Sequence, residues 1–215
     1  MLKRRLQRGD TLIEVLFAVS VFSFVVVSAL TIMNQGTAAS QRSLEITLVR
    51  QQVDAQAETL RFMHDAYVAA YQSHIVFNTT DAATSPAEEW YKMMAAKGNV
   101  ITAASAFESA ATCPAAPSGA FIVDPRNVAF VTKANALQPS TNFSQVTYQS
   151  NGVFDSAKGL WVEAVRSTLS AEQASDGAQS NAGYVDFHIR ACWESAGLPV
   201  ASRTGTIVRL YEPRG

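Results

Sequence analysis

Apolar and polar residues follow three different patterns along the chain, and the first is an uncharged run near the N-terminus. No residue from Val15 to Met33 carries a charge, and the run includes Phe17, Phe22 and Phe24. As an α-helix it would be about 28 Å long, close to the roughly 30 Å hydrocarbon core of a bilayer. A helix is favoured in lipid because each backbone N–H finds its acceptor within the segment. The run therefore predicts a transmembrane helix.

The second pattern is a helical stripe that continues beyond this run. Its apolar and aromatic residues recur at spacings of three and four: Ile46, Val49, Val53, Ala57, Leu60, His64, Tyr67 and Tyr71. No proline interrupts the chain before Pro86. We therefore expect one helix from about Thr11 to about Tyr71, roughly 90 Å long, with Gln35-Gly36 as its weak point. We interpret the stripe as part of a core and not as a ligand surface.

A short second helix and an irregular connector follow. Ser85 is placed as an N-cap, Pro86 as the first helical residue and Glu88 as the closing residue of a capping box, which predicts a helix over 86–97. From Val100 to Gly119 the chain is rich in alanine and serine and contains two prolines. This composition predicts a connector without regular structure.

The third pattern is strand-like and fills the C-terminal half. Six segments are candidate strands: 120–123, 128–132, 145–149, 160–169, 184–193 and 206–211. In Tyr184–Trp193 the two faces alternate, with Val185, Phe187, Ile189, Ala191 and Trp193 on one and Asp186, His188, Arg190 and Cys192 on the other. The connections 170–183 and 194–205 show no helical pattern, so neighbouring strands should be antiparallel. We expect an α+β fold, with a long N-terminal helix packed on a C-terminal antiparallel β-sheet.

The distribution of charge predicts the orientation of the apolar helix in the membrane. Lys3, Arg4, Arg5 and Arg8 precede it, and the first charged residue after it is Arg42. The positive-inside rule then leaves the N-terminus in the cytoplasm and the body outside. Without those four, 13 basic residues face 18 acidic ones, a net charge of about −5, which argues against nucleic acid as a partner.

Three interpretations of the N-terminus remain. The first is a signal peptide cut after Val27-Ser28-Ala29, and the second is a plain single-pass anchor. The third rests on the junction Arg8-Gly9-Asp10-Thr11-Leu12-Ile13-Glu14. It resembles the cleavage and methylation motif of type IV prepilins, in which a basic leader ends in glycine before Thr-Leu-Ile-Glu and an unbroken apolar helix. The mature N-terminus would be Leu30, Met1 or Asp10, respectively.

The resemblance implies that a prepilin peptidase cuts between Gly9 and Asp10. It also implies that Glu14 pairs with the N-terminal amine of a neighbouring pilin subunit during filament assembly. Locally, Thr11 and Glu14 also fit a helix capping box, and the two roles are compatible. The chain departs from the family at Asp10, where an apolar residue is usual. That carboxylate can pair with the new amine, which counts against the N-methylation that the resemblance implies.

The implied domain order follows that of a pilin. It comprises a leader (1–9), a transmembrane and filament-core helix (10–34), the soluble half of the helix (35–75), a connector (76–119) and a sheet (120–215). The expected role is a structural subunit, minor more than major, whose partners are membrane lipid before assembly and then other pilins and the assembly machinery at the cell surface. A secretion pseudopilin, an anchored adhesin and a tethered hydrolase are the alternatives.

Candidate chemistry adds little except a disulfide. We find no phosphate-binding glycine loop, Gly-x-Ser-x-Gly, His-Glu-x-x-His or Cys-x-x-Cys, and we expect no catalytic residue, cofactor or metal site. Export would place Cys113 and Cys192 in an oxidising environment, where we expect them to pair. The bond would close a loop of roughly 80 residues and contribute about 4.5 kcal/mol on the chain-entropy model. It would hold the connector over the outer face of the sheet, whereas the alternative is two separate buried thiols.

Overall fold

The computed structural model contains one long helix, one short helix and nine strands within the residues that it describes. These residues are 10–77, 85–95, 100–107, 112–132, 136–140, 142–166, 183–195 and 198–213, with side chains from Leu12 onward. The chain forms two compact units, Met1–Glu45 and Ile46–Gly215. The second unit is called the body below. The expected leader, residues 1–9, lies outside the described residues.

Helix α1 (Asp10–Gln72) confirms the long helix expected from the sequence, including its passage through Gly36. It ends because His74 adopts a left-handed conformation, with φ of 58°. The Ile75 N–H then donates to the Ala70 carbonyl at 3.2 Å, which satisfies one of the last carbonyls of the helix. The tyrosine-rich end of α1 is therefore closed by a defined cap.

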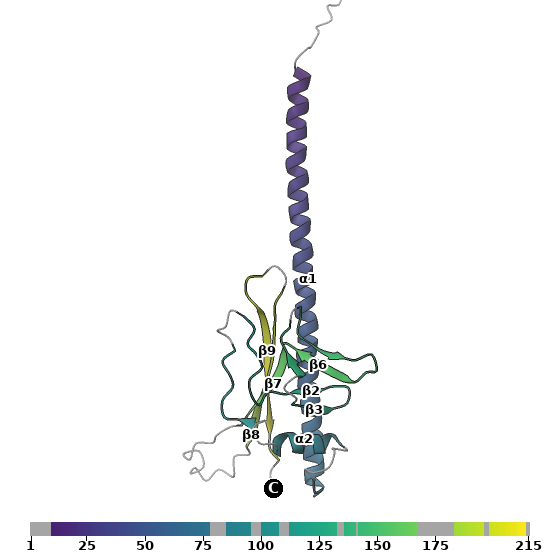
Figure 1. Ribbon diagram of the computed structural model, residues 1–215, viewed down its shortest axis with the longest axis vertical. Coiled ribbons are helices and arrows are strands. Elements are labelled where there is room, and N and C mark those ends of the chain that lie inside the picture. The colour runs from purple at the N-terminus through teal and green to yellow at the C-terminus, as the bar shows by residue number, and fades with distance from the viewer. Residues whose placement is uncertain are drawn as a thin grey trace, which may run out of the picture. The chain divides into compact units, whose positions relative to one another are not determined.

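Helix α2 (Pro86–Ala95) starts as its capping box predicts and crosses α1 near its C-terminal end (Figure 1). The Glu88 N–H donates to Ser85 Oγ at 3.3 Å. The neighbouring Glu89 accepts a hydrogen bond from the Phe130 N–H at 3.3 Å, which joins α2 to a strand of the body. The expected last residues of this helix, 96–97, lie outside the described part of the chain.

The main sheet has the order β1-β7-β8-β9, and Figure 1 labels β7, β8 and β9 of it. Its strands are β1 (Val100–Ile101), β7 (Leu160–Arg166), β8 (Tyr184–Trp193) and β9 (Ser202–Tyr211). The pairings of β8 with β7 and with β9 are antiparallel, as expected, and β1 pairs with β7 in parallel. The predicted extension of β7 to residue 169 lies outside the described residues.

Two small sheets complete the described strands. In one, β2 (Ile122–Asp124) pairs with β3 (Ala129–Val131) in antiparallel fashion. In the other, β6 (Phe154–Lys158) pairs antiparallel with β5 (Gln145–Tyr148) and parallel with β4 (Leu137–Gln138). The α+β fold is confirmed, with antiparallel pairing dominant.

Three details of the sequence prediction are wrong. Strand β9 begins at Ser202, inside the segment 194–205 that we expected to be a connection. Strand β1 lies in the supposedly irregular connector, and β4 and β6 were not expected. Strands β1 and β4 have two residues each, too few to show a period, and β6 has five residues without an apolar and polar alternation. These strands form because a neighbouring strand offers backbone partners.

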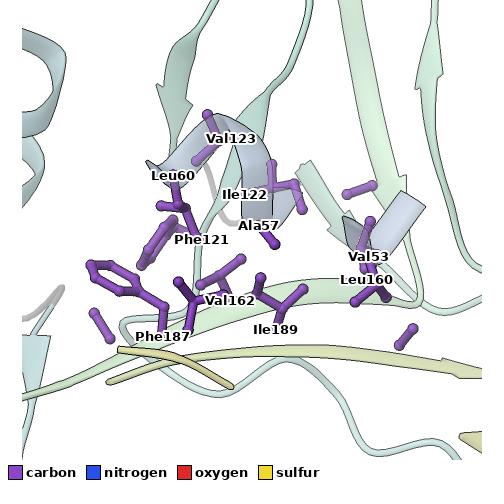
Figure 2. Close-up of a cluster of buried hydrophobic side chains, with 14 of the residues drawn as sticks. Val53, Ala57, Leu60, Phe121, Ile122, Val123, Leu160, Val162, Phe187 and Ile189 are labelled. Carbon is purple, nitrogen blue, oxygen red and sulfur yellow. The ribbon is translucent and has the colours of Figure 1, made fainter. Parts of the chain in front are cut away.

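The core of the body lies between α1 and the sheets. Figure 2 shows Val53, Ala57 and Leu60 of α1 facing Leu160, Val162, Phe187 and Ile189 of the main sheet, with Phe121, Ile122 and Val123 beside them. The helical stripe is thus core from Val49 to Leu60. At its two ends the prediction of burial is wrong, because Ile46 and Tyr71 are each 39% exposed.

Two glutamine side chains of α1 bind the small sheets. The amide of Gln56, which is fully buried, donates to the Val123 carbonyl at 2.7 Å and accepts from the Val123 N–H at 2.9 Å. One turn earlier, Gln52 accepts a hydrogen bond from the Val146 N–H at 3.2 Å. These bonds satisfy backbone groups that would otherwise be buried without partners.

Candidate functional site

The candidate assembly surface is the first unit's part of α1. Every described side chain from Leu12 to Thr37 is exposed, although most are large and apolar. Phe17, Phe22, Phe24 and Met33 are 67–75% exposed, and Val15 is 59% exposed. Such a continuous apolar surface is unfavourable in water and marks a region that contacts lipid or protein. Among the described residues, α1 is the one helix that is long and apolar enough to cross a membrane.

Three hydroxyl groups within this surface are satisfied by the helix itself. Ser20 donates to the Leu16 carbonyl and Ser23 to the Val19 carbonyl, both at 2.8 Å. Thr31 likewise donates to a carbonyl four residues earlier, at 2.9 Å. Back-bonding of this kind leaves these three donors without need of an external partner. These hydroxyls are therefore compatible with lipid or with an apolar protein environment.

Glu14 is the one charged side chain described between Leu12 and Met33, and it is exposed. A carboxylate next to a long apolar surface is costly to bury unless a cation pairs with it. The remaining processing and assembly residues were expected at Gly9, Asp10 and Thr11. Gly9 and the side chains of Asp10 and Thr11 lie outside what the structure describes, so their roles stay predictions.

The expected disulfide is present: Cys113 and Cys192 are bonded, with their Cα atoms 5.5 Å apart. Cys192 lies on the outer face of β8, where it packs with Trp161 and Ala120 in a small second cluster. The bond thus holds the connector on the face of the main sheet opposite to the core. It explains why Cys192 is fully buried although it lies on the polar face of its strand.

A buried carboxylate fixes the same connector at a second point, and the sequence reasoning missed it. Glu163 of β7 is fully buried and accepts hydrogen bonds from the Ser105 N–H at 2.8 Å and the Ser105 hydroxyl at 2.9 Å. Trp161 Nε1 donates to it at 3.0 Å, and Arg190 lies 3.2 Å away. A buried carboxylate needs such partners. A glutamate within the apolar run of residues 160–165 was the available signal.

Two polar residues of β8 form ion pairs and hydrogen bonds with other elements of the body. Asp186 accepts two hydrogen bonds from Arg209, at 2.7 and 2.8 Å, and this arginine lowers the pKa of the carboxyl. Arg190 donates to the Ser105 carbonyl at 2.7 Å. Burial lowers the pKa of His188, which favours its neutral form. Asp186 and Arg190 therefore already serve structural contacts.

The other two histidines, His64 and His74, also have structural roles. His64 lies 2.8 Å from the Tyr211 carbonyl through Nε2, with its ring edge against Trp90, and His74 forms the cap of α1. In the part of the chain that the structure describes, no three His, Cys, Asp or Glu side chains are grouped so that they could bind a metal ion.

Known proteins add no further guide to this arrangement. No family model, curated protein or solved structure matches the chain. What the structure establishes is an α+β fold with a long apolar N-terminal helix and a body that carries one disulfide. This layout is compatible with that of a pilin.

Proposed function

We propose that this chain is a non-catalytic structural subunit of a type IV pilus or a related filament, in a minor position. The subunit is first inserted in the cytoplasmic membrane with its N-terminus inside. A prepilin peptidase cuts after Gly9, and the assembly machinery then moves the apolar helix from lipid into a filament of pilin subunits at the cell surface.

One observation carries the proposal. The exposed apolar surface of α1 begins at Leu12, within the junction Gly9-Asp10-Thr11-Leu12-Ile13-Glu14. A secretory signal would be removed together with most of this surface, and a plain anchor would need neither the glycine nor the glutamate. A filament subunit uses all of these features. The bonded connector supports an extracellular body, because disulfides persist in oxidising compartments.

Glu14 has a specific role in this proposal. Its carboxylate enters the apolar filament core with an unfavourable desolvation free energy, and the N-terminal amine of a neighbouring subunit neutralises it. A minor position is favoured by the large body and by Asp10, which provides the amine with a competing carboxylate in its own subunit.

Cleavage is tested by determining the N-terminal residue of the membrane-inserted protein after coexpression with a prepilin peptidase. We expect Asp10 as the first residue, and Gly9→Val should leave the chain uncut. Gly36→Val is the matched control and should be cut normally, because Gly36 lies well beyond the junction. A mature chain that starts at Met1 would indicate an anchored binding module, and one that starts at Leu30 would indicate a secreted protein. Either result would overturn the proposal.

Assembly is tested separately with Glu14→Ala. We expect normal cleavage but about tenfold lower incorporation into sheared filaments, because the incoming amine loses its partner. Glu58→Ala is the control, since Glu58 is an exposed carboxylate of the body that pairs with Arg61. If the Glu14→Ala subunit were incorporated as well as the control, Glu14 would have no intersubunit role.

A further inference from the structure

The body contains a pocket lined by tyrosines that the filament role does not use. It has a volume of about 360 Å³ and lies where the ends of α1, α2, β7, β8 and β9 meet. Four of its lining residues are Tyr67 and Tyr71 of α1, Tyr91 of α2 and Tyr211 of β9. We refer to it as the tyrosine pocket. All of it belongs to the body, so its geometry does not depend on the N-terminal unit.

The walls of the tyrosine pocket are aromatic and held in place. The rings of Tyr67 and Tyr91 lie nearly parallel at 21°, with centroids 6.4 Å apart, and Tyr71 lies 6.1 Å from Tyr67. Beneath them Trp90 is 4% exposed and packs against Phe187 of the core. Because Trp90 is part of the core, the pocket is formed before any ligand arrives, which lowers the entropic cost of binding.

Polar groups are placed at the edge of this aromatic surface. Arg166 and Glu212 form an ion pair at 3.0 Å, and both side chains are about half exposed. Among the described residues, none forms a hydrogen bond with the hydroxyl of Tyr67, Tyr71 or Tyr91. These hydroxyls and the ion pair therefore offer both donors and acceptors to a ligand.

The electrostatics of Tyr67 indicate that these groups surround a common space. Burial raises its pKa most, followed by the neighbouring phenols Tyr71 and Tyr91 and the carboxylate of Glu212. The hydroxyl of Tyr67 is accordingly protonated at neutral pH and remains available as a donor.

The aromatic rings, the phenol hydroxyls and the ion pair together restrict the class of ligand that the tyrosine pocket can bind. A cation would be attracted by the rings and by Glu212, but Arg166 lines the same pocket and neutralises that carboxylate. A purely apolar ligand would leave the ion pair and the phenol hydroxyls without partners. A sugar ring has an apolar C–H face that packs on an aromatic ring and a rim of hydroxyls that both donate and accept. A pocket of this size, at the small end of ligand sites, fits one or two such rings.

We propose that the tyrosine pocket binds a terminal mono- or disaccharide of a neutral glycan. Tyr71 and Tyr211, which are 39% and 57% exposed, supply the stacking surfaces that a ligand reaches first. Arg166, Glu212 and the Tyr91 hydroxyl bind the sugar hydroxyls. This recognition does not require filament assembly and would persist in a monomeric subunit.

The test uses the full chain in a polyoxyethylene detergent, which carries no sugar headgroup. Saturation-transfer NMR is recorded with glucose, galactose, mannose, N-acetylglucosamine, N-acetylgalactosamine and their β-linked disaccharides, and titrations give the Kd. Tetramethylammonium is the probe for a cation site. We expect at least one sugar to bind with a Kd of about 1 mM or tighter. Tyr71→Ala and Tyr211→Ala should each weaken binding about tenfold.

Two further variants separate recognition from folding. Phe62→Ala removes an exposed aromatic ring of the same helix outside the pocket and should leave the Kd unchanged. Tyr91→Phe keeps the ring and removes the hydroxyl, so it should weaken binding about threefold without altering the thermal unfolding midpoint. The proposal is overturned if no sugar binds at about 100 mM, if the alanine variants bind as well as Phe62→Ala, or if only tetramethylammonium binds.

Discussion

The two parts of α1 satisfy their apolar side chains in opposite ways. From Leu12 to Thr37 the large side chains are exposed, and the hydroxyls of Ser20 and Ser23 among them bond to their own helix. From Val49 to Leu60 the apolar side chains on one face are buried by the sheets of the body, and two glutamines bond to those sheets. The same secondary structure thus serves one region that needs an external apolar partner and another that has found its partner within the chain.

This difference shows that apolar content alone does not identify a core. The first region is more uniformly apolar than the second, yet it contributes nothing to the buried cluster of the body. The second region is amphipathic, and its stripe identifies the face that packs. Substitutions in the two regions should therefore have unequal effects.

The largest effect should come from breaking the disulfide, which constrains the body alone. The double variant Cys113→Ser with Cys192→Ser should lower the free energy of unfolding of the body by about 4.5 kcal/mol on the chain-entropy model. Helicity of the N-terminal unit should not change. Denaturant unfolding followed by tryptophan fluorescence measures the first, because Trp90, Trp161 and Trp193 all lie in the body. Equal unfolding midpoints of the unsubstituted chain with and without reductant would contradict this prediction.

A leucine pair provides the most direct comparison of the two regions. Leu60→Ala empties a fully buried site and should lower the stability of the body by about 3 kcal/mol. Leu44→Ala makes the same change at a residue of the first unit that is 60% exposed, and it should shift stability by less than about 0.5 kcal/mol. Chemical denaturation in detergent measures both. Similar losses for the two variants would mean that Leu44 is also part of a packed core.

Glutamine substitutions extend the comparison to polar groups. Gln56→Ala should cost about 2 kcal/mol, because the Val123 N–H and carbonyl would remain buried without partners. Gln35→Ala, on the exposed first part of α1, should be neutral or slightly stabilising, since alanine has the higher helix propensity. Thermal unfolding of the two variants checks the pair. A neutral Gln56→Ala would mean that water replaces the lost amide.

The smallest expected effect is a gain in helix stability. Gly36→Ala should stabilise the helix locally by about 1 kcal/mol, because a Cβ at this position meets no other atom within 4 Å. Amide hydrogen exchange over residues 30–42 is the measurement. The same change at Gly159 should be destabilising, since φ is 62° and a Cβ there would clash with the Cys192 carbonyl. Faster exchange in Gly36→Ala would contradict the expectation.

The sequence predicted the parts of the fold that have a period or a cap. The long helix, the start of α2 at Ser85 and the strand Tyr184–Trp193 each carry a local signal that no tertiary contact overrides. The short strands β1, β4 and β6 carry none, because they are defined by the strand beside them. The same reason explains why the start of β9 was placed four residues too late.

The candidate sites were predictable to different degrees. The pairing of Cys113 with Cys192 followed from their number and expected compartment, and it is confirmed. The role of Glu163 was not predictable, because its partners Ser105 and Arg190 are distant in sequence. The tyrosine pocket was missed for a related reason. A helical period identifies the face to which Tyr67 and Tyr71 belong, but it does not show where the covering elements stop.

The internal bonding of Ser20, Ser23 and Thr31 has a consequence for the movement of the helix between environments. These three hydroxyls exchange one apolar environment for another without breaking or forming a hydrogen bond. The partition of the helix between lipid and protein then depends on packing and on the charge at Glu14, so the free-energy difference between the two phases stays small. A small difference makes the transfer reversible, and the filament subunit proposed above would then return to the bilayer as readily as it leaves it.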